Sequence, residues 1–463
     1  MKTAIIPVAL LILYLGLAAG CGKKQPSIWE SIKNPEVVAH LKSFVAEEEA
    51  RAKAVTNADA PDFTSFFAAA GRGDWQAVSN IFQDFRNYTG QYKHLSKTND
   101  HLPWPKWRAV LETWGILDAF GEGDEKYSVL FANDIIESIP AGGIYFGGTD
   151  PGWFLVAAMQ RNQAAGDPFF AVPQHGLENA AQLDYLGSMY GGKIYTPTVG
   201  DLQRCALDFT NDAARRLQNH QLKPGEDVTD VNGRVQISGY MVVIGIRERM
   251  TKVIFDQNSN REFYVEESFP LEWMYPYLEP HGIIFKLDRQ PLPALSDEIL
   301  QRDRDYWTKL TVPMIGDWLK PDTSVQEVTA FAKKVFANHD FSGFTGDPQF
   351  VRNDYSCKMF SKERSSIGGL YAWRARQTKD AAERKRMNAA ADFAFRQAWV
   401  LCPYSMETVV RYINVLTSEN KFADALLVAE TVAKMPEMKG QDGGQLRALV
   451  DQIKNLERQA NGK

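Results

Sequence analysis

Cysteine is scarce in this chain, and the few cysteines present form no recognisable pattern. There are 4 among its 463 residues. Beyond Cys21 they are Cys205, Cys357 and Cys402, with no CxxC pair and no histidine at ligand spacing, which argues against a zinc site. In an oxidising compartment one disulfide would fit but would leave one cysteine over, so buried free thiols are the simpler interpretation.

The chain also lacks a strong charge of either sign and the short motifs of several known chemistries. Its formal net charge is −5, so no basic surface for nucleic acid is indicated. The G-x-G-x-x-G motif, the P-loop, the G-x-S-x-G turn and H-E-x-x-H are all absent. No segment after residue 20 is long and apolar enough to cross a membrane. We therefore expect no metal, no cofactor and no nucleic-acid partner.

The first residues have the pattern of a secretory signal. Lys2 supplies a positive charge, residues 4–19 are almost wholly apolar, and Leu17-Ala18-Ala19-Gly20-Cys21 resembles the lipobox of bacterial lipoproteins. This predicts a signal peptide over residues 1–20 and lipidation of Cys21, with residues 21–60 as a polar tether and a solvated helix. The alternative is an uncleaved anchor, although about sixteen apolar residues is short for a span. Either interpretation places the protein in the cell envelope, attached to a membrane and facing the periplasm or the exterior.

The remaining chain divides by pattern into three parts. We predict a helical hairpin region over 61–124, an α/β domain over 125–296 and a helical region over 297–463. In the α/β domain, apolar runs of strand length alternate with helical patterns, which favours a mainly parallel, Rossmann-like sheet. An Asn232-Gly233 turn adds an antiparallel hairpin. The expected strands are 143–146, 169–173, 193–195, 234–237, 262–265 and 282–287, with helices at about 152–163, 177–190, 200–219, 239–256 and 270–279.

The predicted C-terminal helices contain an internal sequence repeat. Residues 391–398 lead to Pro403, and residues 422–429 lead to Pro436, a spacing of about 33 residues that is close to that of a tetratricopeptide repeat. Two or three such repeats and a capping helix over 445–459 are therefore predicted. The expected fold class is a central α/β domain flanked by all-α, tetratricopeptide-like regions, whose concave surfaces bind peptides or proteins.

The first candidate site follows the first predicted strand. Gly147, Gly148, Thr149 and Asp150 precede a helix that begins near Pro151, so free backbone N–H groups and the threonine could hold a phosphate or carboxylate. The simpler alternative is that the glycines let the strand turn into the helix, which Asp150 then caps.

Two further loops carry polar residues after predicted strands. His175 and Asn179 lie on one, and Glu266 and Glu267 on the other. Because ligands bind beyond the carboxyl ends of parallel strands, these side chains could face the first loop. A single histidine in a loop is more often a surface or hydrogen-bonded residue than a base, and one of the glutamates could instead pair with His281. We assign no catalytic residue and treat the eight polar and glycine residues of the three loops as candidate ligand-binding residues.

A basic cluster surrounds Ser365-Ser366 in the helical region. Lys362, Arg364, Arg374 and Arg376 lie close together in sequence. They could hold an acidic partner, and the alternative is a solvated helical face.

Several blocks resemble known families. Residues 139–153, 167–191 and 261–293 resemble, in order, the soluble domain that follows the membrane helices of bacterial protein O-mannosyltransferase-like proteins. Blocks at 266–278, 302–307 and 360–362 are similar to a group of bacterial lipoproteins with tetratricopeptide-like repeats. This chain lacks the multi-helix membrane portion in which the transferase resemblance places glycosyl transfer. It also has Trp153 where the lipoprotein group has an arginine after Asp-Pro-Gly.

These observations lead to two expectations of function. The first is a membrane-anchored, extracytoplasmic lipoprotein that acts as a binding or scaffolding module, with a protein or peptide on the helical repeats and a small anionic or glycosylated ligand at the α/β loop. The second is an enzyme or enzyme subunit acting on glycans or in protein glycosylation, and the sequence leans against catalysis. An enzyme requires the candidate side chains to converge on an accessible pocket, whereas a scaffold would have them capped and its concavity on the helices.

Overall fold

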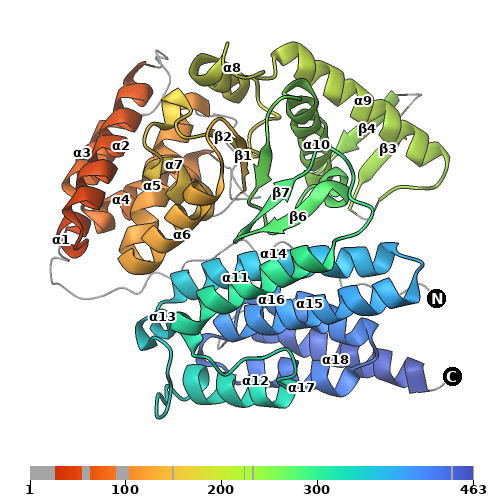
Figure 1. Ribbon diagram of the computed structural model, residues 1–463. Helices are drawn as coiled ribbons and strands as arrows, with labels where there is room; N and C mark the ends of the chain where they lie inside the picture. Colours follow the sequence, from red (N-terminus) through yellow and green to blue (C-terminus); the bar gives the residue numbers. More distant parts are fainter. Residues whose placement is uncertain are drawn as a thin grey trace.

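The structure is a computed structural model that describes residues 27–54, 63–89, 104–148, 151–223, 225–231, 234–438 and 442–461 (Figure 1). Most of these residues are helical, and a small mixed sheet lies in the middle of the chain. Figure 1 shows this sheet beside the N-terminal helices and above the C-terminal ones. An α/β region with flanking helices is therefore confirmed.

The N-terminal part is helical. Its elements are α1 (Ile28–Ser31), α2 (Pro35–Ala54), α3 (Thr64–Arg72), α4 (Trp75–Thr89), α5 (Trp104–Gly121), α6 (Glu125–Ser138) and α7 (Pro151–Met159). The predicted helical hairpin corresponds to α3 and α4, and Gly73 ends α3 at a φ of 68°, which favours glycine.

The prediction of a solvated helix after the tether is wrong. In α2, Val37, Leu41, Phe44 and Val45 are buried at helical spacing, and the helix packs against α5, α7 and α3. The reason is an apolar stripe at i, i+4 and i+7 that the charged residues of the opposite face obscured.

Five short strands form the sheet, in the order β2-β1-β5-β7-β6. They are β1 (Ile144–Gly147), β2 (Phe170–Pro173), β5 (Phe263–Val265), β6 (Leu278–His281) and β7 (Ile284–Leu287). β1 pairs in parallel with both β2 and β5, whereas β7 is antiparallel to both β5 and β6. The prediction of a mainly parallel sheet is therefore correct for one half of the sheet and wrong for the other.

The error arises between residues 270 and 287, where a helix and one strand were predicted. The structure has a 3₁₀ segment, η2 (Glu272–Tyr277), and then a hairpin of β6 and β7. Gly282, with a φ of 62°, forms the turn that reverses the chain between them. A tight turn reverses the strand direction, whereas a parallel pair would require a long crossover.

A second, two-stranded sheet lies outside the first, and its antiparallel pairing was correctly predicted. It pairs β3 (Asp227–Val231) with β4 (Arg234–Ser238), while Asn232 and Gly233 lie outside the described residues. The helices α8 (Ala180–Tyr190), α9 (Val199–Gln218) and α10 (Tyr240–Gln257) belong to the same part of the chain, together with the 3₁₀ segment η1 (Gln163–Ala165). The expected strand at 193–195 is only an isolated bridge between Gly191 and Ile194.

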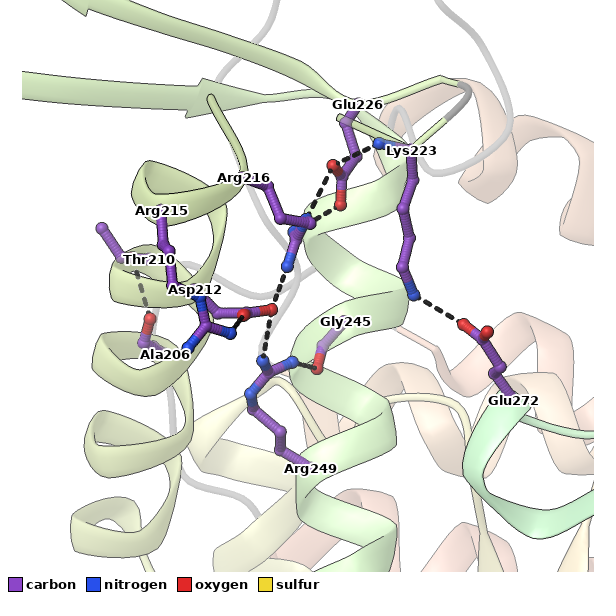
Figure 2. A network of polar contacts seen from close by, with 10 residues as sticks. All are labelled: Ala206, Thr210, Asp212, Arg215, Arg216, Lys223, Glu226, Gly245, Arg249 and Glu272. Carbon is purple, nitrogen blue, oxygen red and sulfur yellow. Dashed lines mark hydrogen bonds and ion pairs between the residues drawn. The ribbon is translucent and has the colours of Figure 1, made fainter. Parts of the chain in front are cut away.

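A charged network joins α9, α10 and the start of β3 (Figure 2). Asp212 accepts from Arg215, Arg216 and Arg249, and Arg216 also donates to Glu226 at 2.5 Å. Each of these arginines has a carboxylate partner inside this network, which favours a structural role over ligand binding.

Eight helices and two shorter helical segments follow the sheet in the described chain. They are α11 (Asp297–Ile315), α12 (Val325–Phe331), the π-helix η3 (Ala332–Ala337), α13 (Pro348–Arg352), α14 (Asp354–Gln377), α15 (Ala381–Leu401), α16 (Met406–Ser418), α17 (Phe422–Val432), η4 (Pro436–Met438) and α18 (Asp442–Asn461). α11 packs against β6 and α14 against β7, so the helical region covers the antiparallel half of the sheet.

α14 is a central helix rather than a solvated one, which corrects the interpretation of its basic cluster. Lys362 donates to Glu266, the buried Arg364 pairs with Asp303, and the buried Arg374 donates to main-chain carbonyls. These three cations have partners inside the protein, so they do not form a surface for an acidic partner, and only Arg376 of the cluster is exposed.

The three cysteines beyond Cys21 are buried free thiols, as the simpler interpretation of the sequence had it. Among the described residues, no helix combines the length and apolarity needed to cross a bilayer.

Candidate functional site

The parallel half of the sheet brings the three predicted loops to one edge. β2, β1 and β5 are neighbours and run in the same direction, so the residues that follow them share one end of the sheet. Two hydrogen bonds join these loops directly. The N–H of Gly148 donates to the Glu266 carboxylate at 3.1 Å, and the N–H of Gln174 donates to the carbonyl of Gly147 at 3.0 Å.

Glu266 is the best-connected residue at this edge. Its side chain is fully buried and accepts from Gly148, from the Tyr145 hydroxyl at 3.2 Å and from the Lys362 ammonium at 3.2 Å. Burial, followed by the negative charge of Glu266, raises the pKa of Tyr145 well above its usual value. The phenol therefore stays protonated as a donor, and the carboxylate is held by three donors inside the protein.

His175 follows β2 and lies against cations. Its Nε2 is 3.4 Å from Arg247, whose guanidinium also pairs with Glu178 at 3.1 Å. Burial lowers the pKa of His175 well below its usual value, and the charges of Arg247, Arg108 and Lys362 lower it further. The imidazole is consequently neutral at pH 7.

The glycines of the first loop are required by packing. A Cβ on Gly147 would lie 2.0 Å from the indole of Trp153, and one on Gly148 would lie 2.6 Å from the carbonyl oxygen of Glu266. These contacts favour the interpretation in which glycine allows the chain to pass close to its neighbours. Thr149 and Asp150, like the lipidation candidate Cys21, lie outside the described residues.

The other predicted residues have separate local roles. Asn179 caps α8 by accepting from the N–H of Ala181 at 2.9 Å. The carbonyl of Glu267 accepts from the Ser366 hydroxyl at 2.6 Å. The Nε2 atom of His281 lies 2.9 Å from the carbonyl of Ser138, so this histidine has a main-chain partner.

The candidate residues that the structure describes at this edge therefore have partners within the protein. Glu266 is inaccessible to a substrate, and Asn179 is occupied as a helix cap. A general base must reach a proton on a bound substrate, and a fully buried carboxylate held by three donors does not.

A groove of about 740 Å³ lies instead on the C-terminal helices, and none of the eight predicted residues lines it. Its walls come from α11, α14 and α15, from Pro321 before α12, and from Glu419 and Lys421 between α16 and α17. The part contributed by α15 runs from Ala381 to Arg396. Those residues correspond to about 24 Å of helix.

The floor of this groove is a fixed polar network. Arg364 donates to both carboxylate oxygens of Asp303, at 2.9 and 2.8 Å, and to Gln397 at 2.9 Å. The Tyr371 hydroxyl donates to Asp303 at 2.7 Å, and the Arg364 guanidinium lies 5.1 Å from the ring of Trp307. Because both charged groups are buried and hydrogen-bonded to each other, they hold the side chains of this floor in fixed positions.

Sequence reasoning missed the pairing of Lys362 with Glu266, and it missed the groove, for different reasons. Lys362 lies 96 residues from Glu266, so no local pattern connects them. The groove had a usable signal. Charged and polar residues recur at helical spacing through 384, 385, 388, 392 and 396, in the segment that forms α15.

No family model, characterised protein or solved structure matches this chain.

Proposed function

We propose that this protein is a membrane-anchored, extracytoplasmic lipoprotein that acts as a binding module, with its ligand held on the C-terminal helices. The observation that carries this proposal is the 740 Å³ groove on those helices, together with the internally bonded side chains at the sheet edge. The packing of each helix on the next, α15 on α16 and α16 on α17, also supports a tetratricopeptide-like organisation of this region. Because the side chains at its edge bond to one another, we interpret the parallel part of the sheet as a Rossmann-like element with a mainly structural role.

Photo-crosslinking from within the groove tests the binding role. A photoreactive phenylalanine is placed at Ala389, an exposed position that lines the groove, and at Ala423 of α17 as an exposed control outside it. We expect discrete adducts from position 389 in cells expressing the full chain and none from position 423. Equal adducts from both positions, or none from either, would contradict the proposal.

The anchoring role is tested separately. Incorporation of labelled palmitate into the full chain should be lost in Cys21→Ser and retained in Cys205→Ser, because only the first cysteine follows the lipobox. Labelling of the Cys21→Ser variant would refute the anchor.

A further inference from the structure

The groove on the C-terminal helices has a charge opposite to that of the whole chain. The chain has a formal net charge of −5. The groove is lined by seven basic and four acidic residues. Four of the basic residues face the acidic ones, in the pairs Arg364–Asp303, Arg386–Asp297, Arg396–Asp392 and Lys421–Glu419.

Three cations remain in excess. Among the described residues, Arg304, Arg384 and Lys385 have no carboxylate within ion-pair distance, and only Arg384 has a hydrogen bond, to the carbonyl of Thr378 at 2.8 Å. Arg304 is on α11 and Lys385 on α15, so unpaired positive charge lies on both walls of the groove. Lys385 is exposed and Arg304 half-buried, so both ammonium and guanidinium donors are available to a ligand.

We propose that this groove binds an extended, acidic peptide segment of a partner protein, an inference that rests on the binding role proposed above. The α15 wall has about 24 Å of length, which accommodates about seven residues of extended chain. Carboxylates of the segment pair with Arg304 and Lys385, while Asn388 offers an amide that can both donate to and accept from a peptide backbone.

The acidic side chains of the lining favour a peptide over a uniform polyanion. Asp297, Asp392 and Glu419 lie among the cations, so an unbroken row of phosphates would face like charge. A peptide that alternates acidic and neutral residues places its charges only where the cations lie. The floor of buried Asp303 and Arg364 is already ordered, so binding does not have to order it.

The test measures binding of a fluorescein-labelled peptide of about seven residues, alternating glutamate and alanine, to the full-length chain in detergent. A peptide with glutamine in place of glutamate is the neutral ligand. We expect the acidic peptide to bind at least about tenfold more tightly, and we expect this preference to shrink as salt is raised from about 50 to about 300 mM. Equal binding of the two peptides would overturn the assignment.

Matched variants locate the binding. Arg304→Gln/Lys385→Gln should weaken binding of the acidic peptide about fivefold or more, because two ion pairs are lost. Lys333→Gln/Lys434→Gln removes the same charge from exposed positions outside the groove and should leave affinity unchanged. Equal loss in both variants would overturn the groove as the site, as would stronger binding of inorganic polyphosphate than of the peptide. If the crosslinking experiment gives adducts at position 389 but the acidic peptide does not bind, only the acidic-peptide assignment is refuted. If neither crosslinking nor peptide binding is observed, the proposed binding role is refuted as well.

Discussion

Substitution of Asp303 by asparagine tests whether the buried charge pair beneath the groove holds the C-terminal helices together. The Asp303 and Arg364 side chains are 3% and 1% exposed, so neither is solvated by water. Asparagine keeps the shape of the residue and an acceptor oxygen but removes the negative charge. Arg364 is then left as a buried cation with no carboxylate partner, whose remaining acceptors, the asparagine oxygen and Gln397, are both neutral.

Breaking a buried pair by removing one partner destabilises a protein by about 3–5 kcal/mol, and we expect Asp303→Asn to fall in this range. The control is Asp305→Asn on the same helix, where an exposed carboxylate accepts from Gln301 at 2.7 Å. Its loss should change the free energy of unfolding by less than about 0.5 kcal/mol.

The assay is urea unfolding of the full chain followed by circular dichroism, with the midpoint compared between variants. A double variant, Asp303→Leu/Arg364→Met, replaces both charged side chains with apolar ones. It should recover much of the lost stability, because no buried charge is then left without a partner. A loss below about 1 kcal/mol for Asp303→Asn, or one equal to that of Asp305→Asn, would refute the reasoning.

Three further predictions concern other parts of the chain. Burial raises the pKa of Asp118 from 3.8 to about 7, so the native protein loses stability as pH rises from about 4 to 7. Asp118→Asn should remove this loss. In urea unfolding, the variant should be more stable than the parent by on the order of 2 kcal/mol at pH 8, with little gain at pH 4. Burial opposes ionisation of Asp347, but hydrogen bonds from Lys126 and Tyr127 outweigh it and lower its pKa to about 2. The contribution of Asp347 to stability is therefore present above pH 4 and lost towards pH 2. Asp347→Asn should reduce the fall in stability between pH 4 and pH 2, and an unchanged fall would contradict the assignment. Gly147→Ala should lower the free energy of unfolding by about 1–3 kcal/mol because the indole from α7 must move, and an unchanged melting temperature would contradict the packing role.

Local pattern predicted much of the site region correctly. The strand and the helix predicted within 139–153 appear as β1 and α7, and the parallel trio of β2, β1 and β5 places the ends of these three strands at one edge. Glycine content, apolar runs of strand length and the position of Pro151 were sufficient for this, because each acts over a few residues.

The surroundings of the site were not predictable in the same way. Glu266 was one of the candidate ligand-binding residues, yet it is buried against Lys362 of α14. Whether a carboxylate binds a ligand or a lysine of the same chain depends on what packs over it, and that packing involves residues distant in sequence.

The sequence alone therefore determined most of the helices, the parallel strands β1, β2 and β5, and the hairpin of β3 and β4, since apolar patterns and turn residues act locally. Tertiary structure alone decided that α2 and α14 are buried, that β6 and β7 form a hairpin, and that the groove lies on the helices rather than at the sheet. The physical reason is that burial and charge pairing depend on contacts such as that of Arg364 with Asp303, which joins residues 61 positions apart.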